Sequence, residues 1–389
     1  MRIETHVTCH LSLVTKMNLY IAIPALDELD YLPQTLAALA QQKTEFPFSV
    51  YICVNQPDNW WNDAEKIEIC NHNQELLKYL KAFKAFKIII LDKTSVGKGW
   101  QNNNYGVGWA RKTLFDEIMK TAKDDDVIIS LDADTLFTEN YLQSVGENFI
   151  QNKIEVLSLP YYHKLTADEN ANRAILRYEI YLRNYFINMH RIGSPYTFTA
   201  IGSAIAAKVN VLQKIRGITP LKNGEDFYLL QKLRKMTPIS NYNSEIVYPA
   251  ARFSTRVDFG TGPAMIKGSS GNWDSSPIYH HSLFDKIKET YDIIPQLFTE
   301  DIETEFIDFL KKQYKTEDLW SPLRKNFKTL PQFTRAFHEK ADGLRILQFL
   351  KYSFQLSVAS YELQVTSDEL EGTRERLFEE EMKLRKNSF

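Results

Sequence analysis

The segment DVIISLDAD, residues 126–134, is a short apolar run that ends in two acidic residues. Four more short apolar runs lie in the first 160 residues, and segments with apolar residues at helical spacing separate them. This alternation is typical of parallel β-α units, so we predict an α/β fold with a doubly wound, Rossmann-like, mostly parallel sheet and helices on both faces. The strands are expected at 18–24 (NLYIAIP), 48–54 (FSVYICV), 87–91 (KIIIL), 126–131 and 156–159.

The helices of this sheet, and the elements that follow it, are predicted from the same periodicity. In the helix expected at 171–189, Tyr178, Tyr181, Leu182 and Tyr185 are spaced for one face. The other helices are expected at 29–42, 74–86, 100–120, 140–150 and 227–236, with short strands at 198–206 and 246–248.

The last third of the chain is expected to be a glycine-rich loop followed by helices. Four glycines in the segment 257–273 indicate a loop, and the final hundred residues carry apolar clusters at helical spacing. The segment 367–386 is highly charged and helix-forming. We expect it to be a solvated helix or a helix that binds a partner.

Composition excludes several classes of protein. The 389 residues include 47 Lys and Arg against 49 Asp and Glu, which gives a net charge of −2 and no electrostatic signature of nucleic-acid binding. The three cysteines form no CxxC pair, which argues against a zinc site or a disulfide framework and favours a reducing, cytoplasmic location. No run of 18 apolar residues is present, so no transmembrane segment is expected, and peripheral contact with a membrane stays open.

The first 16 residues show no signal-peptide pattern, and Met17 directly precedes the first expected strand. We therefore expect residues 1–16 to be an N-terminal extension that the fold does not need.

Polar residues that follow the strands are the candidates for a site, because ligands of such sheets bind outside the carboxyl ends of the strands. Asp132 and Asp134 come directly after the fourth strand, and their i, i+2 spacing puts both carboxylates on one side. Two carboxylates at this place suit a hard divalent cation that bridges to phosphate oxygens. A solvated loop or a helix cap is the alternative, and the pair alone does not decide between them.

The end of the first strand gives a second candidate. Pro24, Ala25, Leu26, Asp27 and Glu28 end the strand and open the next helix. A carboxylate there can bind a nucleotide base or ribose, or it can cap the helix and interact with its dipole.

Two more segments carry candidate chemistry. Gly97, Lys98 and Gly99 follow the third strand and suit a phosphate, although the spacing is not that of a P-loop; a surface turn is the alternative. Glu225 and Asp226 open a helix far downstream, where a carboxylate could act as a general base or only cap the helix.

In this order and at these places, the four segments resemble those of family 2 glycosyltransferases with the GT-A fold. The resemblance covers about residues 17–270. It implies a metal-dependent transferase of the hexosyltransferase type that moves a sugar from a UDP- or GDP-sugar to a carbohydrate or glycolipid acceptor, as in polysaccharide biosynthesis.

The resemblance also implies roles for single residues. Glu28, with Pro24, Ala25 and Asp27 around it, would line the base and ribose, and Lys98 would lie near the nucleotide. Asp132 would touch the ribose or the metal, and Asp134 would ligate Mn²⁺ or Mg²⁺. Asp226 would be the base of an inverting reaction, with Glu225 beside it in acceptor binding.

Departures from the family pattern leave parts of this interpretation open. Asn55 and Asp58 lie where many members carry an acidic stretch that reads the base, so Asn55 is a candidate nucleotide contact and the base is undetermined. The segment RVDFGTG, 256–262, is a candidate acceptor or diphosphate loop. His280 and His281 are either a late metal ligand or a surface pair.

Two other functions remain as alternatives, namely a retaining transferase and a catalytically silent GT-A module that binds a partner. The expected organisation is an extension (1–16), a nucleotide-sugar-binding half (17–160), an acceptor-binding half (161–275) and a mostly helical C-terminal region (276–389).

Overall fold

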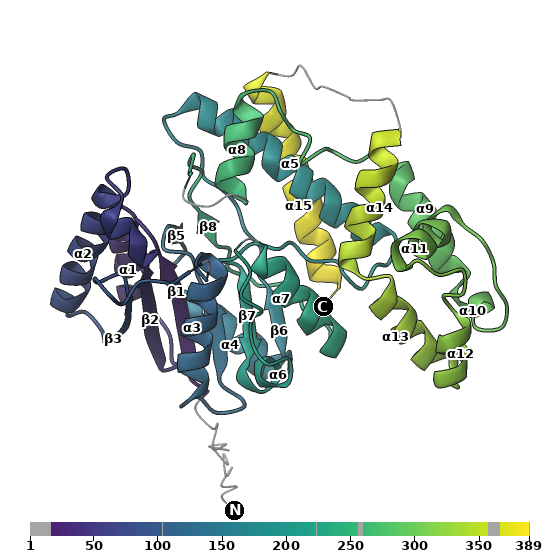
Figure 1. Ribbon diagram of the computed structural model, residues 1–389, viewed down its shortest axis with the longest axis horizontal. Helices are drawn as coiled ribbons and strands as arrows, with labels where there is room; N and C mark the ends of the chain where they lie inside the picture. Colours follow the sequence, from purple (N-terminus) through teal and green to yellow (C-terminus); the bar gives the residue numbers. More distant parts are fainter. Residues whose placement is uncertain (1–16, 103, 223, 256–259, 357–365, 389) are drawn as a thin grey trace, which may run out of the picture.

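The computed structural model describes residues 17–102, 104–222, 224–255, 260–356 and 366–388. The expectations for residues 1–16 and for the first four residues of the segment 256–262 lie outside the described residues. Helices and strands follow one another in the expected order along the first 160 residues (Figure 1).

A six-stranded sheet forms the centre of the first half of the chain. The strand order is β3-β2-β1-β4-β7-β6, and β1 runs parallel to both β2 and β4. The predicted α/β sheet is confirmed, with the correction that β7 is antiparallel to both of its neighbours. The strands are β1 (Leu19–Ala25), β2 (Phe48–Asn55), β3 (Ile88–Lys93), β4 (Val127–Ser130), β6 (Val156–Ser158) and β7 (Ile205–Lys208).

Helices cover both faces of the sheet, because successive strand residues point to opposite sides. In β1, Ile21 and Ile23 belong to one apolar cluster, while Ala22 between them belongs to the other. The first cluster contains apolar residues of α1 (Leu32–Ala40), α2 (Ile67–Ala82) and α4 (Tyr141–Gln151). The second contains those of α3 (Val107–Met119), α6 (Val209–Lys214) and α7 (Glu225–Met236).

The strand order places a topological switch between β1 and β4. The chain builds β1, β2 and β3 outward in one direction and then returns to add β4 on the other side of β1. Loops that leave neighbouring strands at such a point diverge and open a crevice at the carboxyl ends. The residues after β1 and β4 are therefore expected to border a cavity.

The composition of the segment 257–273 predicts a glycine-rich loop, but the segment is not a loop throughout. Its middle forms α8 (Thr261–Ser269), where two glycines allow close packing. A Cβ at Gly262 would lie 2.8 Å from Ser254, and one at Gly268 would lie 2.2 Å from the Trp273 ring. Nearby, the strand expected at 246–248 is the short β8 (Tyr248–Pro249), which pairs with β5 (Thr135–Leu136).

The C-terminal region is helical, as expected. Its core includes the buried Trp320, whose ring stacks on Phe337 with centroids 5.0 Å apart. Within the described residues, none of the helices combines the length and apolarity needed to cross a bilayer. The helices are α9 (His281–Asp292), α10 (Ile294–Leu297), α11 (Glu305–Tyr314), α12 (Ser321–Asn326), α13 (Leu330–Lys340) and α14 (Gly343–Leu356).

The charged C-terminal segment corrects the sequence interpretation. It forms α15 (Ser367–Asn387), one face of which packs along α5 (Glu169–Arg191) while the rest of the helix is exposed (Figure 1). Arg374, Glu381 and Arg385 are buried, and Glu381 accepts a 2.7 Å hydrogen bond from Arg183 of α5. Opposite charges on the two helices compensate one another, so a face that looks polar in the sequence is an internal contact.

Candidate functional site

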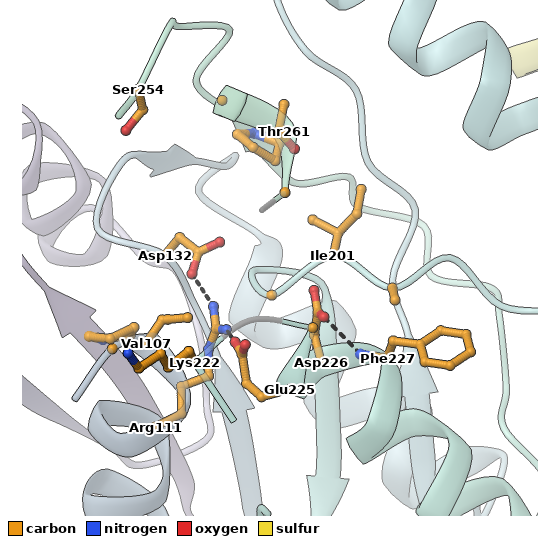
Figure 2. Close-up of a pocket in the computed structure, with 18 of the residues that line it drawn as sticks. Val107, Arg111, Asp132, Ile201, Lys222, Glu225, Asp226, Phe227, Ser254 and Thr261 are labelled. Carbon is orange, nitrogen blue, oxygen red and sulfur yellow. Dashed lines mark hydrogen bonds and ion pairs between the residues drawn. The ribbon is translucent and has the colours of Figure 1, made fainter. Parts of the chain in front are cut away.

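A cavity of about 750 Å³ lies at the carboxyl ends of the strands. It extends between the sheet and helices α5, α7 and α14, and Figure 2 shows part of its wall. The structure brings most of the sequence-predicted site residues together here. Those that line it are Pro24, Ala25, Glu28, Asn55, Asp132, Asp134, Glu225 and Asp226.

Arg111 joins two of these carboxylates. It lies on α3, is 4% exposed, and donates through its two terminal nitrogens to Asp132 and to Glu225 (Figure 2). A Cβ at Gly202 would lie 2.0 Å from the Arg111 guanidinium, so a glycine is required there for the arginine to reach between the acids. The contact ties the end of β4 to the start of α7.

Arg252 joins another two carboxylates. Its guanidinium donates to both carboxylate oxygens of Glu28, at 2.9 and 2.7 Å, and its Nε donates to Asp134 at 2.9 Å. The guanidinium carbon lies 3.8 Å from the ring centre of Tyr31, an arrangement that suits a cation–π contact. Residues after β1 and β4 are thus bridged across the switch point.

Asp226 lies beside these ion pairs in the first turn of α7. The residue that caps this helix is Gly224, at φ +72°, and not Asp226. One Asp226 oxygen accepts a 2.7 Å hydrogen bond from the Phe227 amide, which keeps the carboxylate at the cavity wall (Figure 2). Burial, reinforced by the neighbouring Glu225 carboxylate, raises the pKa of Asp226 to about 7. Such a group exchanges a proton near neutral pH, which is what a general base requires.

Two predicted contacts do not line the cavity. Asp27 has a left-handed backbone, at φ +57°, and one of its carboxylate oxygens lies 3.0 Å from His72 Nδ1. Lys98 pairs with Asp92 at 3.0 Å and is largely exposed. The amides of Gly97 and Gly99 donate to the Asp58 carboxylate, so a side chain of this protein takes the place expected for a phosphate. The roles proposed for Asp27 and Lys98 stay predictions.

The histidine pair is a surface pair in this structure. His280 and His281 are exposed, and their rings lie 4.1 Å apart. The nearest polar partners of their Nδ1 atoms are the Ser282 hydroxyl and an Asp285 oxygen. Neither histidine lines the cavity.

Arg111, Arg252 and His163 are among the cavity residues that the sequence analysis missed. Arg111 had a signal, because it occupies the apolar stripe of α3 shared with Leu114, Phe115 and Ile118, where a charge needs a buried partner. No sequence pattern pointed to Arg252 or to His163. His163 lies after β6, and its Nδ1 is 2.6 Å from a carboxylate oxygen of Glu179.

The acidic residues of the cavity were compared with what a divalent cation requires. Across the described residues, no group of three or more His, Cys, Asp or Glu side chains could hold a metal ion alone. Mg²⁺ commonly needs only one or two carboxylates, since water and substrate phosphates complete its shell. Asp132 and Asp134 supply hard oxygen donors in one cavity, so they fit this two-carboxylate type of site. Each also accepts from an arginine, with which a cation would compete.

No protein-family model matches the sequence, and no curated protein matches it. Among solved structures, residues 1–349 of Staphylococcus aureus TarS in complex with UDP-GlcNAc are 13% identical with a TM-score of 0.43, covering 96% of this chain and 91% of that one. Mannosyltransferase PcManGT from Pyrobaculum calidifontis, in complex with GDP-Man and Mn²⁺, is 10% identical with a TM-score of 0.42, covering 95% and 84%. At these identities and TM-scores the likeness carries no information about the chemistry of the cavity.

Proposed function

We propose that this protein is a glycosyltransferase that moves a sugar from a nucleotide-sugar donor to an acceptor hydroxyl. The observation that carries the proposal is the meeting of Asp132, Asp134 and Asp226 in one cavity at the switch point of the sheet. The first two are proposed to bind the diphosphate and its cation, and the third, whose pKa burial raises to about 7, is proposed as the base.

The donor is proposed to bind along the ends of β1, β2 and β4. Glu28 and Asn55 offer hydrogen-bonding groups for the base and ribose, and both line the cavity. Bound at Asp132 and Asp134, Mn²⁺ or Mg²⁺ would neutralise the charge that the departing nucleoside diphosphate gains. Arg111 and Arg252 hold these carboxylates in place, which keeps the donor set ordered before the ligands arrive.

Asp226 is proposed to take the proton of the acceptor hydroxyl as its oxygen attacks the anomeric carbon. In an inverting reaction the acceptor approaches from the face opposite to the leaving diphosphate. The position of Asp226 at the start of α7, separated from Asp132 by Glu225 and Arg111, suits that arrangement (Figure 2). Glu225, whose own pKa burial raises, is proposed to position Arg111 and the acceptor side of the site.

The finer assignments belong to the same proposal. They are membership of glycosyltransferase family 2, hexosyl transfer from a UDP- or GDP-sugar in polysaccharide biosynthesis, a cytoplasmic location, and a division into donor-binding (17–160) and acceptor-binding (161–275) halves. A retaining mechanism is the alternative, and the anomeric configuration of the product, read by NMR, separates the two.

The test is ligand-induced stabilisation with UDP-glucose, UDP-GlcNAc and GDP-mannose, each with and without Mn²⁺. A donor at a hundred times its dissociation constant should add about 2.7 kcal/mol to the free energy of unfolding. Asp134→Asn should remove the Mn²⁺-dependent part of this effect. The matched control is Asp308→Asn, an exposed acid on α11 that does not line the cavity, which should respond like wild type. No stabilisation by any of these donors, or an Mn²⁺ effect that survives in Asp134→Asn, would contradict the proposal.

A further inference from the structure

One face of α5 is largely aromatic, and it lines the cavity as well as packing against the apolar core. Tyr178, Tyr181, Leu182 and Tyr185 all line the cavity and are partly exposed. Their i, i+3, i+4, i+7 spacing makes a continuous stripe along the helix. The opposite face of α5 carries Glu179 and Arg183, which are buried against α15.

A second apolar surface faces the cavity from α14. Leu344 and Leu347 line the cavity at i, i+3 on one face of the helix, and Lys351, one turn further on, adds a charged group at the end of that face. Phe198 and Ile201, buried residues before β7, also line the cavity.

These surfaces lie on the Asp226 side of the cavity. Phe227, which follows Asp226, has its ring centre 6.3 Å from that of Phe198. Figure 2 shows Ile201 and Phe227 on the side of Asp226 away from Arg111 and Asp132. The cavity therefore has a charged end, where the donor is proposed to bind, and an apolar end beyond the proposed base.

We propose that the apolar end is an acceptor subsite for an amphipathic molecule, one that presents a sugar hydroxyl to Asp226 and an alkyl chain between α5 and α14. The inference rests on the proposed function and specifies its acceptor. Leucine, isoleucine and phenylalanine side chains offer no partner for sugar hydroxyls, and each tyrosine offers only its single hydroxyl, so a sugar buried here would lose hydrogen bonds. A hydrocarbon chain loses nothing there and gains from leaving water, by about fourfold in affinity for each buried methylene.

The experiment compares n-octyl β-D-glucopyranoside with methyl β-D-glucopyranoside, titrated calorimetrically below the concentration at which the octyl compound forms micelles. The two probes share one sugar and differ only in the alkyl chain. Wild type is expected to bind the octyl glycoside at least tenfold more tightly. Leu347→Gln, and separately Leu182→Gln, should reduce that preference at least fivefold while circular dichroism and the melting temperature show a folded protein.

The matched control is Leu330→Gln, which makes the same change at a leucine that is 38% exposed on α13 and does not line this cavity. It should keep the wild-type preference. Equal affinity of wild type for the two glycosides, or an equal loss in Leu330→Gln and Leu347→Gln, would overturn the acceptor subsite.

Donor binding is measured on the same preparations to separate the two proposals. Donor binding by wild type and by Leu347→Gln alike, without any octyl preference, would overturn the subsite alone. Absence of donor binding would overturn the proposed function and with it the acceptor role, even where the octyl preference holds.

Discussion

Two clusters of buried charge in this protein are built from arginines and acidic residues, but they shift the pKa values of their acids in opposite directions. Between α5 and α15, three arginines meet two glutamates, and all five side chains are at most 1% exposed. In the cavity, two arginines are each shared between two carboxylates, and a fifth carboxylate, Asp226, lies beside them. The members of the first cluster are Glu179, Arg183, Arg374, Glu381 and Arg385.

The proton affinities of the acids differ accordingly. In the helix pair, Arg183 and His163 hold the pKa of Glu179 at about 2 in spite of its burial. In the cavity, burial and like charge raise the pKa of Asp226 to about 7. A buried acid with enough cations around it stabilises the ionised form and belongs to the architecture. A buried acid with too few is poised to exchange protons or to bind a cation.

The largest expected effect is on transfer by Asp226→Asn. Asparagine keeps the size of the side chain but cannot act as a base, and loss of general-base catalysis typically lowers the rate about 10²–10⁴-fold. Donor affinity and melting temperature should stay near wild type, because the helix is capped by Gly224 and not by residue 226. The measurement is sugar transfer to an acceptor alongside donor binding. Near-normal transfer would remove Asp226 from the proposed mechanism.

Arg183→Met tests the other cluster. The change leaves Glu179 and Glu381 buried without the arginine that donates to both, at 2.9 and 2.7 Å. Removing one partner of a buried ion pair typically costs about 3–5 kcal/mol, so the urea midpoint should fall markedly. Arg335→Met, at an exposed ion pair on α13, is the control and should cost less than about 1 kcal/mol. Equal, small losses in both variants would show that burial does not distinguish the α5–α15 cluster.

Dependence on pH separates the clusters further. Because a base must be ionised and the pKa of Asp226 is raised to about 7, the transfer rate should fall about tenfold per pH unit below that value. The pKa of Glu179 is lowered to about 2, so its contribution to stability is present above the ordinary glutamate value and is lost as pH falls toward 2. Rate profiles and acid unfolding curves should therefore show transitions several pH units apart. A transfer rate that does not change between pH 5 and 8 would contradict the prediction for Asp226.

The smallest effect is expected at the start of α15. Thr366 and Glu369 form a reciprocal capping box, in which each side chain accepts a hydrogen bond from the backbone amide of the other residue. Thr366→Ala should cost about 0.5–2 kcal/mol of stability and leave transfer unchanged. Urea unfolding measures the loss, and Thr366→Ser should restore most of it. A changed transfer rate at full stability would instead link this helix end to the cavity.

The parts of the site that the sequence could predict are those that follow directly from strand ends. Asp132, Asp134 and Glu28 come immediately after apolar runs, and parallel strands bring such residues to one edge of the sheet. Lys98 is also near a strand end, but it pairs with Asp92 and does not line the cavity, while Asp58 accepts hydrogen bonds from the glycine amides on either side of it. A contact of this kind does not change the pattern of apolar residues, so it cannot be predicted from that pattern.

The parts that could not be predicted depend on contacts between distant segments. Arg252 reaches Glu28 across 224 residues of sequence, and no local pattern announces such a pair. The charges of α15 predict a solvated helix or a helix that binds a partner, because periodicity reports polarity and not its compensation by another helix of the same chain. The glycines of α8 were interpreted as loop residues, although Gly262 and Gly268 allow close approach of neighbouring segments. In each case the residue depends on a contact with a segment that lies outside the short stretch of sequence in which a pattern can be recognised.

The packing of α15 against α5 also affects when the protein can finish folding. Arg183 and Glu381 are separated by 198 residues, and a ribosome adding 5–20 residues per second needs roughly 10–40 s to make the intervening chain. During that interval α5 carries Glu179 and Arg183 without the helix that buries them. The charged cluster between α5 and α15 is therefore completed late in synthesis, after the sheet that holds the donor residues has had time to form.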